Sequence, residues 1–157
     1  MSNLKKLLDE RGICTTIIKG EVELEERLRI VDSFKNGDIQ VLITNPHTLA
    51  ESVSLHQVCH DAVYFEYSYN LVHLLQSKDR IHRLGLAENQ YTQYHYMMSE
   101  FVYNGDIYSL DEQIFNRLVE KEQTMLDAID QNILEHGTSR QEDLDLIFGK
   151  LFAKKIK

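Results

Sequence analysis

Short apolar runs alternate with amphipathic segments along most of this sequence, and the alternation restricts the fold more than any other feature. The apolar runs are rich in β-branched or aromatic side chains, as strands are, and occupy residues 14–18, 39–43, 62–65 and 91–97. The segments between them space apolar residues at helical intervals, over residues 2–11, 21–34 and 70–84. This pattern predicts an α/β fold, a doubly wound parallel sheet with helices on both faces in three layers.

The sequence predicts the ends of the first helix and the buried face of the second. Ser2 or Asn3 is suited to cap the first helix, and Gly12 to stop it. In the second helix an apolar stripe is expected to face the core, and it consists of Leu24, Leu28, Val31 and Phe34.

Two capping boxes mark helices near the C-terminal end. Ser109-Leu110-Asp111-Glu112 opens a helix predicted to reach about Leu134, and Ser139-Arg140-Gln141-Glu142 opens a last one. Residues 98–108, just before them, are predicted to be an irregular connection. We therefore expect a lobe over residues 1–105, followed by a helical extension over residues 106–157 that packs on it.

The charge is unevenly distributed. The formal net charge is −8, and residues 106–145 hold eleven acids against three bases, while the remainder of the chain is balanced. A broad basic surface for nucleic acid is therefore absent from the sequence, but a local phosphate-binding surface is not excluded.

The cysteines and histidines do not form a metal motif. Cys14 and Cys59 lie far apart and are predicted to be free thiols in a reducing compartment. His56 and His60 are four residues apart, but no further ligand cluster accompanies them, so no zinc site is predicted. No apolar run approaches the length of a membrane span.

The stretch Gln76–Gly85 concentrates polar side chains at the end of the predicted third helix. If residues 70–84 are helical, Gln76, Arg80 and Arg83 share one face. Two guanidiniums held on one face suit phosphate oxygens, because each binds them through a planar fork. The alternative is a solvated face on which Asp79 and Arg83 form an ion pair.

The order of the motifs carries a resemblance. They are Gly20, Glu26-Arg27, Phe34 with Gly37, Thr44-Asn45 at a strand end, and Gln76-x-x-Asp79-Arg80-x-His82-Arg83-x-Gly85. In this order they resemble the C-terminal RecA-like lobe of superfamily-two helicases, and residues 79–85 resemble the Swi/Snf-type DNA translocases. The resemblance covers about residues 1–97, but the strand that usually begins this lobe is not found before the first helix. The later helix with Glu112 and Lys121 is similar to the helix that follows the lobe in that family.

The resemblance implies one half of an ATP-driven motor that tracks on double-stranded DNA. The Walker lysine and the acidic magnesium motif of the other lobe are not found in this sequence. ATP and Mg²⁺ are therefore expected only in a full-length protein, where an N-terminal RecA-like lobe is the partner. We expect that protein in the bacterial cytosol or nucleoid, or in the nucleus, and not in a membrane.

The resemblance also assigns roles to single residues. Arg80 and Arg83 match the arginine fingers that reach the nucleotide phosphates, and Gln76 and Asp79 match the residues that support them. Residues 44–55 match the loop that contacts DNA and couples it to the nucleotide cleft. The candidates within that loop are Thr44, Asn45, Ser52 and Ser54.

The sequence departs from the family at two places. The segment Ala50–Leu55 lacks the two glycines that the coupling loop usually carries, and Leu86 replaces a glutamine. A second hypothesis is therefore a non-enzymatic RecA-like module that binds a protein partner through its acidic helices. A flavodoxin-like domain is disfavoured, because no glycine-rich phosphate turn follows any predicted strand.

Overall fold

The computed structural model describes residues 1–45, 54–82, 90–131 and 138–153. The chain divides into two compact units. The first unit comprises Met1–Ala62 and Leu75–Gln93, and the second comprises Val63–Leu74 and Tyr94–Lys157. No helix within the described ranges is long and apolar enough to cross a membrane. The division into a lobe and an extension at residue 105 stays a prediction.

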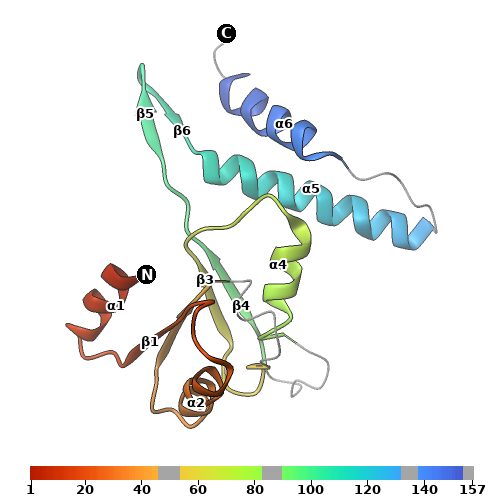
Figure 1. Cartoon of the computed structure of the whole chain (residues 1–157). Helices are drawn as coiled ribbons and strands as arrows, with labels where there is room; N and C mark the ends of the chain where they lie inside the picture. The colour runs from red at the N-terminus through yellow and green to blue at the C-terminus, as the bar shows by residue number, and fades with distance from the viewer. Residues whose placement is uncertain (46–53, 83–89, 132–137, 154–157) are drawn as a thin grey trace. The chain divides into compact units, whose positions relative to one another are not determined.

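The first unit contains a parallel strand–helix–strand arrangement. Its elements are α1 (Ser2–Asp9), β1 (Thr15–Ile18), α2 (Leu24–Lys35) and β2 (Val41–Thr44). Strands β1 and β2 pair in parallel, from Thr15 opposite Val41 to Ile18 opposite Thr44, with α2 as the connection (Figure 1). These elements confirm the predicted order of strands and helices at the start of the chain.

Helix α2 buries only part of the predicted stripe, and Val31 is the predicted residue that is confirmed as buried. Val31 is 2% exposed, but Leu24 is 61% exposed and the prediction that Leu24 and Leu28 belong to the core is wrong. The buried residue one turn before Val31 is Arg27, whose Nη2 donates to the carbonyl of Val22 at 3.3 Å. A long arginine stem covers apolar surface while its head binds a backbone oxygen, so Arg27 takes the inward position.

Helix α1 ends as predicted but begins differently. Gly12 has a φ of +76°, and its N–H donates to the carbonyl of Asp9 at 2.9 Å, as expected of a glycine that stops a helix. The predicted caps Ser2 and Asn3 are wrong, because Met1 is the N-cap residue and no side chain caps this end.

The strands predicted at 62–65 and 91–97 are present as β3 (Asp61–Tyr64) and β4 (Gln93–Tyr96), and α4 (Leu71–Lys78) lies between them in sequence. The N–H groups of Gln93 and Met97 donate to the carbonyls of His60 and Tyr64, respectively. The second bond lies four residues further along both strands, so β3 and β4 run in the same direction, as in a parallel pair. In the described part of the chain the strands are joined pairwise into three two-stranded sheets, whereas we predicted one continuous sheet.

Residues 98–108 are not the irregular connection that we predicted. They contain a β-hairpin of β5 (Phe101–Tyr103) and β6 (Asp106–Tyr108). Its two-residue turn has Asn104 at φ 52° and Gly105 at φ 86°, which is the backbone of a type I′ turn. The Asn-Gly pair was the sequence signal for this hairpin, and the prediction overlooked it.

Both predicted helix starts are confirmed, with Ser109 and Ser139 as the capping side chains, and the box is complete at Ser139. The N–H of Glu112 donates to Ser109 Oγ at 3.1 Å at the start of α5 (Leu110–Gln131). At the start of α6 (Arg140–Ala153) the exchange is reciprocal: Ser139 N–H donates to Glu142 Oε2 at 2.6 Å, and Glu142 N–H donates to Ser139 Oγ at 3.3 Å. The bond from the Ser139 backbone lowers the pKa of Glu142. The predicted end of the first of these helices, at Leu134, lies outside the described residues.

A buried carboxylate joins α5 to α6. Asp143 is 2% exposed and accepts hydrogen bonds from Arg117 Nε at 3.0 Å, from Thr138 Oγ1 at 2.8 Å and from Lys121 Nζ. We call these four residues the Asp143 clasp. Burial alone raises the pKa of Asp143, but the bonds from Lys121, Thr138 and Arg117 outweigh it and hold that pKa below its usual range.

Aromatic side chains form much of the packing in the second unit. Tyr64 and Tyr96 stack with their ring centroids 5.1 Å apart, and Tyr96 also contacts Phe115 of α5 at 4.7 Å. The Tyr67 hydroxyl donates to the carbonyl of Asp111 at 3.2 Å, and burial together with the Asp111 charge raises the pKa of Tyr67 to about 12. Alternating tyrosines of β4 therefore pack internally, as aromatic pairs on strands usually do.

Candidate nucleotide and nucleic-acid site

The described part of the predicted arginine motif runs from the last residues of α4 into a turn. The helix ends at Lys78, and residues 79–82, which we call the arginine turn, follow it. The N–H of Arg80 donates to the carbonyl of Ser77 at 3.3 Å, and that of Ile81 to Lys78 at 3.1 Å. These three-residue spacings tighten the end of the helix.

The early end of α4 corrects the prediction of a helix over residues 70–84. Gln76 belongs to the helix and Arg80 to the turn, so the two do not occupy successive turns of one helical face. Gln76 and Asp79 are both exposed. Arg83 and Gly85 lie outside the described residues.

The backbone of the arginine turn is held from two sides. The N–H of Leu55 donates to the carbonyl of Arg80 at 2.8 Å, and Thr92 Oγ1 donates to the carbonyl of Ile81 at 3.4 Å. Leu55 and Ile81 are both buried. Because Leu55 closes the predicted coupling loop, that loop and the arginine turn are joined by a direct backbone hydrogen bond.

The Arg80 side chain is half-buried, and the N–H group at its Nε donates no hydrogen bond to the described residues. This atom is buried and has no acceptor within the described ranges of the chain. A buried donor without an acceptor costs free energy, and a guanidinium offers five N–H donors in a fixed fork. The guanidinium of Arg80 therefore has at least one donor that the described residues do not use.

The coupling-loop candidates are only partly described. Thr44 is the last residue of β2, and its Oγ1 donates to the carbonyl of Asn45 at 3.2 Å, while Asn45 itself is exposed. Ser54 Oγ lies 2.6 Å from His56 Nδ1. Ser52 lies outside the described residues.

Two histidines near this loop share one glutamine. Gln90 Nε2 donates to the His56 carbonyl at 3.2 Å and lies 2.9 Å from His60 Nε2. In the described part of the chain no group of three potential ligands could hold a metal ion. Sequence reasoning missed His56, Gln90 and the Leu55 backbone as parts of this region, and only the four-residue spacing of the histidines hinted at them.

Comparison with known families identifies the family of this chain's first part. The sequence profile of the helicase conserved C-terminal domain matches residues 1–85, which includes the coupling-loop candidates and the whole arginine motif. No curated protein matches the chain.

Solved structures show the same architecture. The C-terminal part of the Fun30 ATPase domain superposes with a TM-score of 0.66 at 14% identity, over 98% of this chain and 44% of that one. Dbp5 of S. cerevisiae bound to RNA and ADP–BeF3 gives a TM-score of 0.56 at 19% identity, over 76% of this chain and 28% of Dbp5. The chain thus spans less than half the length of these proteins, and the likeness confirms the RecA-like α/β fold.

Proposed function

Because this chain belongs to the family of helicase conserved C-terminal domains, we propose that it is the C-terminal motor lobe of an ATP-dependent DNA translocase or helicase. In this proposal an N-terminal RecA-like lobe supplies the Walker lysine and the magnesium-binding acid, and completes the nucleotide site. The observation that carries the proposal is the hydrogen bond between Leu55 and Arg80, which joins the predicted coupling loop to the arginine turn.

Arg80 and Arg83 act on the phosphates in this proposal. The buried Nε of Arg80 lacks an acceptor among the described residues, and a phosphate oxygen would supply one. Arg83 follows three residues later and would deliver its charge across the cleft as an arginine finger. Such fingers are worth roughly 10³–10⁵ in rate, or about 4–7 kcal/mol. Gln76 and Asp79 would support the two guanidiniums.

The coupling loop would transmit contact with nucleic acid to the arginines. Thr44, Asn45, Ser52 and Ser54 are the proposed contact residues, and Leu55 immediately follows them. A displacement of the loop would pull on the Arg80 carbonyl through the Leu55 N–H, because no side chain intervenes between the two backbone groups. The backbone link provides a short mechanical path from nucleic acid to the phosphate-binding side chains.

Double-stranded DNA is the proposed track, because residues 79–85 resemble the Swi/Snf-type translocases. We accordingly place the full-length protein in the cytosol, the nucleoid or the nucleus. RNA is the alternative track, so the experiment compares ATP turnover stimulated by duplex DNA with that stimulated by single-stranded RNA.

The decisive measurement is ATP turnover by the full-length protein carrying Arg83→Ala. We expect DNA-stimulated turnover to fall at least about a hundredfold, which is below the smallest rate effect typical of arginine fingers. Arg83→Lys should restore little, since an ammonium lacks the guanidinium fork. Arg80→Ala should also reduce turnover, because it removes the half-buried guanidinium.

Arg29→Ala is the matched control. Arg29 is an exposed arginine of α2 that pairs with Glu25 at 3.1 Å, and its loss should leave turnover within about twofold. Retention of more than about half the turnover by Arg83→Ala would contradict the finger assignment, as the expected effect is far larger. A full-length protein with no Walker lysine and no turnover would favour the interaction module instead.

The interaction module has one observation of its own. Arg117 and Lys121, the two basic residues of α5, are both engaged by Asp143, while Glu112, Asp127 and Asp130 are exposed. The outer surface of α5 is therefore acidic, as expected of a helix that binds a basic protein partner.

A further inference from the structure

The hairpin β5–β6 exposes apolar side chains on both of its faces. Residues that pair across the strands share a face, so Val102 and Ile107 occupy one face, and Phe101 and Tyr103 lie with Tyr108 on the other. Val102 is 71% and Ile107 56% exposed, and Phe101 and Tyr103 are about half exposed. Only Tyr108 is buried in this set, where it stacks with Phe101 at 5.6 Å.

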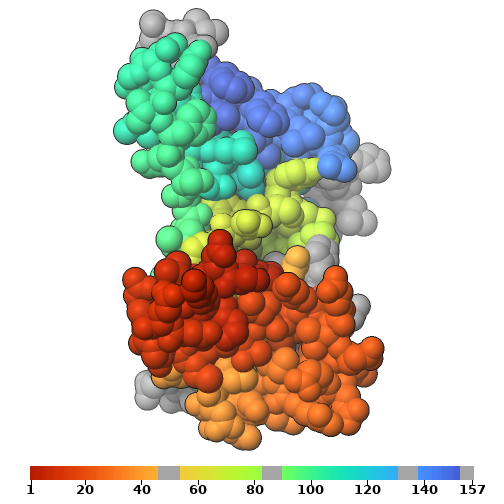
Figure 2. Space-filling view, turned by 60° about the vertical axis from the view of Figure 1, so that its left-hand side comes forward, coloured from red at the N-terminus to blue at the C-terminus, as the bar shows by residue number. Residues whose placement is uncertain are grey.

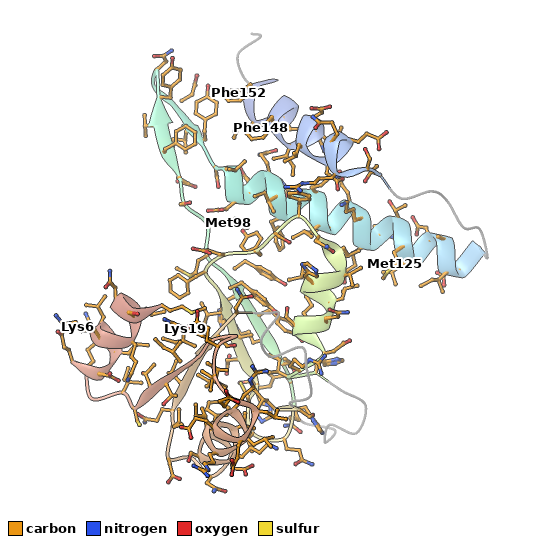
Figure 3. The ribbon with its side chains drawn as sticks, viewed as in Figure 1. Lys6, Lys19, Met98, Met125, Phe148 and Phe152 are labelled. Carbon is orange, nitrogen blue, oxygen red and sulfur yellow. The ribbon has the colours of Figure 1, made fainter. Side chains whose placement is uncertain are left out.

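Helix α6 adds two aromatic side chains beside the hairpin. Figures 1 and 2 both show α6 next to β5–β6 within the second unit. Phe148 and Phe152 lie on the side of α6 nearer the hairpin in Figure 3, and both are about half exposed. We call the exposed set the hairpin patch: Phe101, Val102, Tyr103, Ile107, Phe148 and Phe152.

An isolated two-stranded ribbon is at best marginally stable in water. No third strand pairs with β5 or β6 among the described residues. The large exposed side chains therefore add little to the stability of the hairpin on its own. Contiguous exposed apolar surface of this kind marks interaction sites.

The charges around the patch select the partner. Residues 98–112 contain the acids Glu100, Asp106, Asp111 and Glu112 and no lysine or arginine, while Lys150, which lies between Phe148 and Phe152 in α6, is paired with Glu120. Asp111 accepts from the Ser99 backbone at 2.8 Å, whereas Glu100 and Asp106 are exposed at the base and the tip of the hairpin. The exposed acids of the hairpin disfavour a nucleic acid, and a second copy would add the same acids to the interface without adding a hairpin lysine or arginine to pair with them.

We propose that the hairpin patch is a docking surface for a protein segment that carries lysine or arginine next to large apolar side chains. The apolar side chains of that segment cover the patch, and its cations lie against Glu100 and Asp106. This surface does not depend on the motor role proposed above, since it contains none of the arginine or coupling-loop residues.

The probe is a short fluorescent peptide built from leucine and lysine, with a counterpart in which glutamate replaces every lysine. Fluorescence anisotropy with the full chain should show the lysine peptide binding at least about tenfold tighter than the glutamate peptide. The double variant Val102→Ser with Ile107→Ser, and separately Phe148→Ser with Phe152→Ser, should each weaken binding of the lysine peptide at least about tenfold.

Charge variants and a control variant allow the proposal to be tested even if a serine variant does not fold. Glu100→Gln and Asp106→Asn leave the apolar side chains in place and should weaken binding while reducing its dependence on salt. The matched control is Leu24→Ser, an equally exposed apolar residue of α2 in the first unit, which should change binding by less than about twofold.

Three results would overturn the proposal. One is equal weakening by Leu24→Ser and by the patch variants. Another is a dimer in light scattering that Val102→Ser dissociates, because the occupant would then be a second copy. The third is tighter binding of duplex DNA than of the lysine peptide, with Phe152→Ser abolishing it.

Discussion

The backbone N–H of Leu55 lies 2.8 Å from the carbonyl oxygen of Arg80 and donates to it. The two residues are far apart in sequence, and both lie within the region that the helicase C-terminal domain profile matches. The bond fixes the end of the predicted coupling loop against the arginine turn without involving a side chain. Substitutions at either residue therefore leave the hydrogen-bonding groups in place and act through packing or charge.

The Ser139 capping box should contribute measurably to stability. Ser139→Ala removes the Oγ acceptor of the Glu142 N–H and should lower the free energy of unfolding by about 0.5–2 kcal/mol. Ser2→Ala is the control, because no side chain caps α1 and the change should have little effect. Urea denaturation of the three proteins measures both effects, and equal losses would show that the cap contributes nothing specific.

Removing the charge of Asp143 should be the most damaging single change in the second unit. Asp143→Asn leaves Arg117 and Lys121 without their buried counter-charge and should cost about 3–5 kcal/mol. Asp145→Asn is the matched control, because Asp145 is exposed and bonds only to Gln141 in the contacts described, and should cost less than about 0.5 kcal/mol. Similar unfolding midpoints for the two variants would contradict the clasp.

The Asp143 clasp also predicts a pH dependence. The pKa of Asp143 is lower in the folded protein than in the unfolded chain, where it is about 3.9. A carboxylate whose pKa is lowered by folding stabilises the folded protein at pH values above its pKa in the unfolded chain. This stability is lost as the pH falls through its pKa in the folded protein. The difference in unfolding free energy between the wild type and Asp143→Asn should therefore be constant above about pH 5 and shrink below about pH 4. A difference that grows on acidification would contradict the sign.

Two glycines should respond to alanine in opposite directions. Gly105 has a φ of +86° in the hairpin turn, so Gly105→Ala should destabilise the protein by about 1–2 kcal/mol. Gly149 lies within α6, and an added Cβ would meet nothing within 4 Å, so Gly149→Ala should stabilise by about 0.5–1 kcal/mol. Thermal unfolding compares the two, and a loss of stability in Gly149→Ala would mean that the helix position has another constraint.

Local signals in the sequence predicted the secondary structure well where a few residues determine it. The caps at Ser109 and Ser139 depend on residues three apart; both serine caps are present, and the reciprocal bond is present at Ser139. The Asn104-Gly105 turn is equally local, and the hairpin was missed because its signal was not weighed. Helix-forming patterns alone did not reveal that α4 ends at Lys78, because the residues after it enter a turn whose backbone is bonded by Leu55, far away in sequence.

Non-local packing decided the features that the sequence left open. The leucines of α2 fit a helical stripe, yet Arg27 and Val31 face inward, because the buried arginine head binds the Val22 carbonyl. The Asp143 clasp joins residues from two helices and the segment before α6, and no spacing rule connects Arg117 to Asp143. The roles of Arg80 and Arg83 followed from the order of motifs, and they stay predictions until turnover is measured.

The parallel pairing of β1 with β2 has a consequence for the order of folding. Thr15 and Val41 meet only after the whole of α2 has brought the chain back, so this pair closes a long loop before it gains any contact. The β5–β6 hairpin closes over two residues, and hairpins form in about 1–10 μs. The β5–β6 hairpin can therefore close before β1 and β2 pair, although it follows them in the chain.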